Sequence, residues 1–262
     1  LFVMATSRVV GLVIQFFAIR VYFDLLGGAG FGICNALVNL QRFVALADLG
    51  LPESTNRQMA AAWAEGDDQK GLRVWNTHKR IIGVAFVLIV ILYVALSALY
   101  PMREVHLTGW PRVNIFLFAG IAMGLVYLIA GYGSWFTSRR QFGPVAKANL
   151  WVSVGGSAFS VLFVYLLRTP VAYFYGFVCG AGCGVLSLIW RRRGELSSRA
   201  VPGFDRAVFA EARSFGLRAL ANKLSSALGN GADRVVIHQK LGESAIAQYN
   251  VSLRAPEAAY DA

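Results

Sequence analysis

The sequence predicts an all-α protein, a polytopic bundle of membrane-spanning helices. The main observation is a series of four uncharged apolar runs, Ile81–Tyr100, Val113–Phe136, Ala148–Leu167 and Val171–Trp190. Each run holds 20 to 24 residues, and a helix needs about 20 residues to cross a bilayer. Hydrophobic residues make up 56% of the chain and charged residues only 15%, whereas soluble domains average about 25% charged residues.

Three less apolar runs complete the predicted set of spans. These further predicted helices cover about residues 1–26, 30–51 and 216–239. A turn at Gly27–Ala29 separates the first two, and an eighth segment begins shortly before Ala262. Because the chain begins with Leu1 rather than methionine and stops inside that segment, we expect a longer protein.

The basic residues are distributed unevenly between the predicted loops. With the N-terminus in the cytoplasm, loops 52–80, 137–147 and 191–214 hold fourteen lysines and arginines, whereas the outward loops hold three. This asymmetry follows the positive-inside rule and predicts a multi-pass membrane protein with its N-terminus in the cytoplasm. The net charge of +11 does not indicate nucleic-acid binding, because the cations occupy loops rather than one surface of a folded domain.

A weak internal repeat suggests two lobes. The pattern Leu26, Gly27, Gly32 and Asn35 recurs 215 residues later as Leu241, Gly242, Ala247 and Asn250. Parallel repeats of this kind form the two halves of transporters, with the substrate between them. We therefore predict a six-helix lobe over residues 1–190, a linker over 191–214 and the start of a second lobe over 215–262. Within the linker, residues 204–212 favour a short amphipathic helix at the membrane surface.

Polar side chains recur at helical spacing in three of the predicted spans. They are Arg8 and Gln15 in the first helix, Asn35, Asn39 and Arg42 in the second, and Arg218 and Asn222 in the seventh. Ionisable groups at membrane depth usually face a cavity and mark a substrate path. Guanidinium groups bind phosphate in bidentate fashion, so these stripes indicate an anionic substrate. The alternative is that Arg8 and Arg218 snorkel to the interface and only anchor their helices.

Other residue patterns are better explained by structure than by chemistry. Arg20 and Asp24 are predicted to form an ion pair one helical turn apart. Trp110, Trp135 and Trp190 fall at helix ends, where aromatic belts form. Glycines at intervals of four in the fourth and sixth helices favour close helix packing; they are Gly120, Gly124, Gly176, Gly180 and Gly184. Gly155–Gly156 favours a bend in the fifth helix.

The histidines and cysteines give no metal or redox motif. His78, His106 and His238 are scattered, so we expect all three on polar surface. Cys34, Cys179 and Cys183 all lie within predicted spans and have neither metal-ligand nor disulfide spacing.

Several short motifs along the chain carry a family resemblance: Ser7–Gly11, Leu25–Gly32, Asp48–Leu51 with Arg57, Asp233–Ile237, Leu241–Gly242 and Tyr249–Asn250. With these motifs the chain resembles the Wzx-type polysaccharide flippases of the multidrug/oligosaccharidyl-lipid/polysaccharide exporter superfamily, which implies a location in the bacterial inner membrane. The motif Ser7–Gly11 also resembles the first-helix motif of the related lipid II flippases, in which the arginine faces the cavity.

The resemblance implies a protein of twelve to fourteen helices that moves undecaprenyl-pyrophosphate-linked glycans by alternating access, for O-antigen or exopolysaccharide synthesis. It makes Arg8 and Arg42 candidates for pyrophosphate binding, and Arg218 and Lys223 join them by position. It implies coupling to H⁺, Na⁺ or the membrane potential, without a bound cofactor. The expected partners are the membrane, the lipid-linked glycan and other membrane proteins of polysaccharide assembly.

Two other functions compete with this interpretation. A multidrug or cation antiporter of the same superfamily should line its cavity with carboxylates, yet each aspartate near the polar spans has an arginine within reach. A polysaccharide polymerase or ligase needs a long external loop for its catalytic groups, and the predicted outer loops are short. No phosphate loop or nucleophile motif occurs, so we expect a protein that is not an enzyme.

Overall fold

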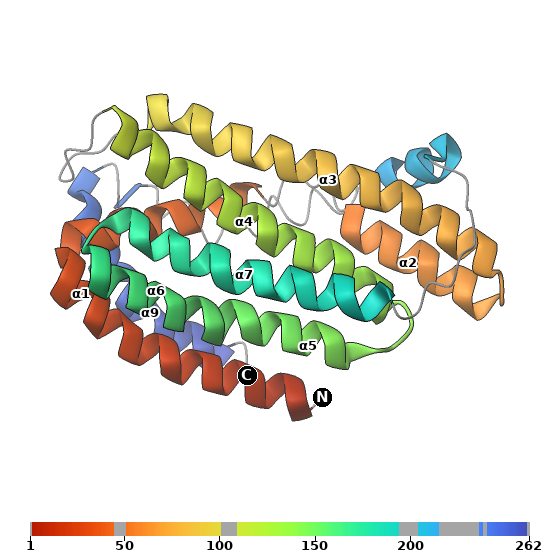
Figure 1. The fold of residues 1–262 in the computed structure, drawn as a ribbon, viewed down its shortest axis with the longest axis horizontal. Coiled ribbons are helices and arrows are strands. Elements are labelled where there is room, and N and C mark those ends of the chain that lie inside the picture. The colour runs from red at the N-terminus through yellow and green to blue at the C-terminus, as the bar shows by residue number, and fades with distance from the viewer. Residues whose placement is uncertain are drawn as a thin grey trace.

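The computed structural model describes residues 2–44, 51–100, 109–193, 204–214, 236–237 and 240–260, which fold as helices joined by short turns, with no strand among them. Five helical stretches are long and apolar enough to cross a membrane, by length and composition, at Phe16–Leu40, Asp68–Leu99, Trp110–Thr137, Phe142–Leu167 and Pro170–Arg193. The first of them contains a kink at Gly27. Figure 1 shows the long helices lying roughly alongside one another. The chain is an all-α, multi-pass membrane helix bundle, and its last four spans contain nearly all of the four clean apolar runs.

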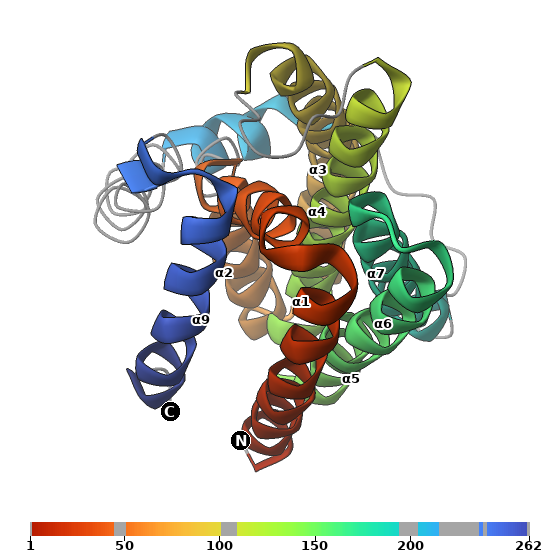
Figure 2. The same ribbon diagram turned by 90° about the vertical axis from the view of Figure 1, so that its left-hand side faces the viewer.

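The first helix, α1 (Phe2–Val44), contains a reversal of the chain at Gly27. There the backbone has φ 71° and ψ 170°, a conformation that favours glycine. The rings of Tyr22 and Phe31 are stacked with centroids 5.5 Å apart, whereas nine residues of straight helix would separate them by about 13.5 Å. The two halves of α1 are therefore separate helices joined at the predicted turn (Figure 2). Residues 45–50, the end of the predicted second span, lie outside the described residues.

The segment over residues 52–80, predicted as a cytoplasmic loop between two spans, is largely helical. It contains α2 (Leu51–Ala64) and the first part of α3 (Asp68–Leu99). The 32 residues of α3 extend for about 48 Å, longer than the hydrocarbon core of a bilayer. In its first part, Leu72 and Trp75 are buried, while beyond residue 81 Val84 is 61% exposed. The uncharged run thus marks only the part of α3 that faces lipid.

The remaining spans are α4 (Trp110–Thr137), a rod of three consecutive elements, and α7 (Pro170–Arg193). The rod consists of α5 (Phe142–Leu150), a π-helical turn η2 (Trp151–Gly155) and α6 (Gly156–Leu167). The π-helical turn ends at the glycine pair where the sequence predicts a bend. It lies against α7.

Glycines bring these helices into backbone contact, as their spacing predicts. A Cβ atom at Gly180 of α7 would overlap the backbone of Gly156 in α6, and one at Gly176 would overlap the backbone of Ser160. A Cβ atom at Gly120 of α4 would collide with Tyr93 of α3. Such contacts replace the hydrophobic effect as the source of helix association within a membrane.

The segment predicted to form a short amphipathic helix is helical, over residues 206–214. The carboxylate of Asp205 caps this helix by accepting hydrogen bonds from the backbone N–H groups of Ala207 and Val208. The backbone N–H of Asp205 in turn donates to Thr77 Oγ1 of α3 at 3.0 Å. This short helix (light blue in Figure 1) is therefore held against the first part of α3.

The last described helix, α9 (Glu243–Tyr260), begins the second predicted lobe. It packs along α1, and Figure 2, which views the end where α1 turns, shows it descending beside that helix. Most of the predicted seventh helix, residues 216–235 and 238–239, lies outside the described residues.

Candidate functional site

The predicted polar face of the second span is represented by Asn35 and Asn39, both in the second half of α1. Asn35 is only 5% exposed, and its Nδ2 donates to the carbonyl oxygen of Phe31 at 3.2 Å. Asn39, one turn further on, is half-buried and also makes a polar interaction. In this conformation Asn35 is covered by its neighbours and bonds within its own helix.

The other six predicted site residues have no described side chain. Arg218, Asn222 and Lys223 lie outside the described residues, as do the side chains of Arg8, Gln15 and Arg42. The backbone of α1 nevertheless relates two of them. Because the chain reverses at Gly27, the second half of α1, whose sequence includes Arg42, runs back toward the end of the bundle at which the first half, which includes Arg8, begins (Figure 1).

A close contact joins the turn of α1 to the start of α9. A Cβ atom at Gly32 would overlap the backbone carbonyl group of Glu243, and one at Gly28 would lie 3.4 Å from Ser244 Oγ. Glu243 is fully buried there. Glu243 and Ser244 stand in no motif that predicts this contact; the spacing of Gly28 and Gly32 was the available signal. At Gly32 the backbones of α1 and α9 thus approach each other directly.

The two copies of the predicted repeat share local geometry at this contact. Gly27 and Gly242, which occupy equivalent positions, both have positive φ, 71° and 91°. Asn35 and Asn250 are both buried, at 5% and 7% exposure. Each copy therefore has a glycine with positive φ before a helix that carries a buried asparagine eight residues after that glycine.

Two polar or amphipathic residues predicted at the surface are buried at the opposite end of the bundle. Trp135 is 0% exposed, so its assignment to an aromatic belt is wrong, although Trp110 and Trp190 are 70% and 83% exposed. His78 is 1% exposed, with Nδ1 2.9 Å from Thr55 Oγ1, so its surface assignment is wrong as well. Both are covered because α2 packs on α3 and α4. His106 and His238 lie outside the described residues.

The described acidic side chains do not assemble into a metal site. No group of three His, Cys, Asp or Glu side chains that could hold a metal ion occurs in the described part of the chain. The predicted ion pair of Arg20 and Asp24 is confirmed, with Nε and Oδ2 4.0 Å apart and both side chains exposed. Asp24, a carboxylate of the first span, is thus matched by a cation of its own helix.

Comparison with known proteins gives consistent relationships. A family model described as "Polysaccharide biosynthesis protein" matches residues 1–254. A Yersinia pseudotuberculosis protein named "Putative O-antigen export protein" is 29% identical over 177 residues, which cover 63% of this chain and 37% of that relative. The chain also superposes on a solved multidrug transporter of the MATE family in an inward-facing conformation. That match has a TM-score of 0.63 and 18% identity and covers 95% of this chain and 60% of the transporter.

Proposed function

Because the chain belongs to the polysaccharide biosynthesis protein family, we propose that it forms the first lobe, and the beginning of the second, of a lipid-linked oligosaccharide flippase. Its substrate is an undecaprenyl-pyrophosphate-linked glycan for O-antigen or exopolysaccharide synthesis. The protein moves this substrate across the bacterial inner membrane by alternating access and does not modify it. The chain spans 37% of the length of its Yersinia relative, so the proposal concerns the whole protein.

The observation that carries this proposal is the contact between α1 and α9. Gly32 lets the backbone of α9 approach α1 closely, and Gly242 at the start of α9 repeats the positive φ that Gly27 has within α1. Parallel repeats of this kind form the two lobes of transporters, which move against each other around a central substrate site. The contact between the two copies therefore supports a two-lobed transporter over a rigid membrane scaffold.

The chemistry of the cavity favours an anionic substrate. Arg8, Arg42 and Arg218 are the candidates to hold the pyrophosphate, because guanidinium groups match phosphate oxygens in planar, two-donor geometry. A cation antiporter would instead need available carboxylates, and Asp24 is already beside Arg20. H⁺ or Na⁺ coupling, and association with other polysaccharide-assembly proteins, belong to this proposal.

The function can be tested in cells that lack the protein. We expect surface polysaccharide to disappear and the lipid-linked glycan to accumulate with its sugar on the cytoplasmic side. Extraction of labelled lipid-linked glycan, combined with a membrane-impermeant glycan-modifying enzyme on spheroplasts, measures both quantities. Normal surface polysaccharide together with increased sensitivity to cationic drugs would instead establish an antiporter.

The proposed orientation places the N-terminus in the cytoplasm. Lys147 and Thr169 are exposed at opposite ends of the α5–α6 rod, so single cysteines there should face opposite sides of the membrane. In a variant with serine at Cys34, Cys179 and Cys183, we expect an impermeant thiol reagent on intact spheroplasts to label position 169 and not 147. Labelling of position 147 alone would reverse the topology.

A further inference from the structure

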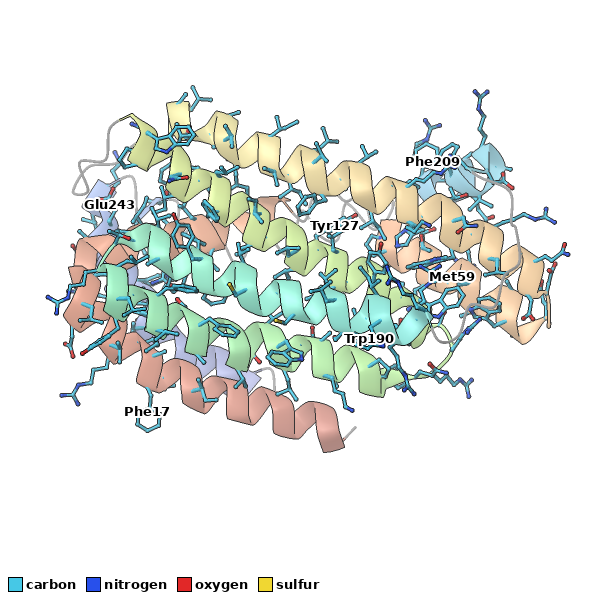
Figure 3. The ribbon with its side chains drawn as sticks, in the orientation of Figure 1. Phe17, Met59, Tyr127, Trp190, Phe209 and Glu243 are labelled. Atoms are coloured by element: carbon cyan, nitrogen blue, oxygen red, sulfur yellow. The ribbon has the colours of Figure 1, made fainter. Side chains whose placement is uncertain are left out.

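Three tryptophans from three helices meet at the end of the bundle that carries α2. Trp63 of α2 and Trp75 of α3 both pack edge-on against Trp135 of α4, with ring centroids 5.6 Å and 5.3 Å apart. Trp75 and Trp135 are fully buried. Figure 3 shows Met59 of α2 and Trp190 of α7 at this same end of the molecule. By the proposed topology, this is the cytoplasmic end.

Two arginines cover these rings. The guanidinium carbon of Arg139, which follows α4, lies 4.2 Å from the Trp63 ring centroid and 4.1 Å from that of Trp135. The guanidinium carbon of Arg192, near the end of α7, lies 4.5 Å from Trp75 and 5.2 Å from Trp135. Two cations therefore share the Trp135 ring, which attracts each of them but does not neutralise their mutual repulsion.

Two buried N–H groups of this cluster have no hydrogen-bond acceptor among the described residues. Among the described residues, no carboxylate oxygen lies within 4.0 Å of Arg192. The Nε atom of Arg192 and the Nε1 atom of Trp75 are both shielded from solvent, and neither has a hydrogen-bond acceptor in the described structure. Buried N–H groups without acceptors are costly. Arg192 and Trp75 thus each present a buried N–H group that an added acceptor could satisfy.

We propose that Arg192 and Arg139, above the floor formed by Trp75 and Trp135, bind one phosphate-type anion at the cytoplasmic surface of the first lobe. A phosphate group supplies a negative charge beside Arg192 and acceptor oxygens for the N–H groups of Arg192 and Trp75, and arginine matches its geometry. This site differs from the proposed substrate site. Arg139 follows α4 and Arg192 lies in α7, whereas the candidate substrate residues Arg8 and Arg42 belong to α1. The location of the anion site depends only on the fold, and its cytoplasmic assignment rests on the proposed topology.

The headgroup of an acidic phospholipid and free phosphate share this chemistry. The lipid has the stronger claim, because Trp190 is 83% exposed only two residues before Arg192, where tryptophan marks the level of lipid headgroups. Anionic lipids of the cytoplasmic leaflet also collect around basic clusters next to membrane spans. An anion here would bridge α4 and α7. It would also stabilise the packing of α2, whose Trp63 Nε1 donates a hydrogen bond to Ser138 Oγ, at the C-cap of α4, at 3.2 Å.

The triple-arginine end of α7 provides a matched experiment. Arg192 and Arg193 are adjacent, but Arg193 is exposed, and only Arg192 has a cation–π contact with the cluster. We would measure retention of phosphatidylglycerol by the purified full protein, using native mass spectrometry, with zwitterionic phosphatidylethanolamine, which has no net charge, as the control lipid. Arg192→Gln should bind phosphatidylglycerol about tenfold more weakly, the loss of one charge-assisted hydrogen bond. Arg193→Gln should bind it as the wild type does.

Further measurements separate the anion sources and guard against misfolding. Displacement of phosphatidylglycerol by inorganic phosphate at millimolar concentration would assign the site to a free anion, whereas resistance to phosphate would assign it to the lipid. If Arg192→Gln fails to fold, the pair Arg139→Gln and Arg140→Gln repeats the comparison, because Arg140 is exposed. Equal binding by a cluster variant and its matched control, or equal retention of the two lipids by the wild type, would overturn the proposal.

Discussion

Replacing Gly32 by leucine should abolish polysaccharide export while leaving the protein folded and at normal abundance. Any side chain at this position would overlap the backbone of Glu243, so the contact between α1 and α9 could not close. Because the two partners belong to different lobes, the lobes can relieve the overlap by separating at this end. The variant should therefore stay in the conformation that is open there.

Two further glycines supply the controls. Gly180→Leu creates a similar overlap, with the backbone of Gly156, but within one lobe, where no hinge relieves it. Overpacking a tight contact costs about 1–3 kcal/mol or more, so we expect this variant to lose membrane abundance. Gly182→Leu, on the same helix, has nothing within 4 Å of its new Cβ atom and should export normally. These abundances are measured by immunoblotting of membranes beside surface polysaccharide.

The accessibility of the α1–α9 contact distinguishes a locked protein from a merely weakened one. Cysteine at Ser244, which lies beside Gly28, should react with an impermeant thiol reagent faster in Gly32→Leu than in the Gly32 protein. Wild-type export by Gly32→Leu would show that this contact never closes during transport. Loss of abundance equal to that of Gly180→Leu would show that it is permanent packing.

The spans were predictable from sequence to the extent that lipid selects their composition. A helix surrounded by hydrocarbon must be apolar over its whole circumference. The helices α4, α6 and α7 can therefore be recognised in the sequence as uninterrupted apolar runs. The first part of α3 is different, because protein covers one side and water the other. Its polar residues, such as Arg73 and Lys79, conceal a helix that tertiary packing against α2 stabilises. Hydropathy alone therefore predicts that this span begins at Ile81, although α3 begins at Asp68.

The candidate site was predictable only as helix faces. Helical spacing correctly groups Asn35 with Asn39, but it gives no information on which helix covers that face. Asn35 is buried in the packed region between α1 and its neighbours, which depends on contacts more than a hundred residues apart in sequence. The tryptophan–arginine cluster was missed for the same reason. In the sequence, Arg139 and Arg192 each look like an ordinary loop cation. Only the packing of α4 and α7 places both guanidinium groups beside the Trp135 ring.

Arg42→Ala should abolish export with normal protein abundance, and Arg42→Lys should retain only part of the activity. Arg42 lies in the second half of α1, past Asn35 and Asn39 on the predicted polar face, where a cation is costly unless it meets water or an anion. If it holds the pyrophosphate, geometry matters as well as charge, because lysine cannot reproduce the planar pair of donors. Surface polysaccharide, normalised to membrane abundance, measures the effect.

A purely structural role for Arg42 predicts a different order of variants. If the guanidinium group only pairs with a neighbour such as Asp48, removing it leaves a buried charge without a partner, and abundance should fall before transport does. Arg20→Ala is the matched control, because Arg20 is an exposed arginine of α1 paired with Asp24 and should be dispensable for export. Removing a surface pair of this kind costs about 0–1 kcal/mol. Full export by Arg42→Ala at wild-type abundance would remove this residue from the substrate path, and the anionic-substrate argument would then depend on Arg8 and Arg218.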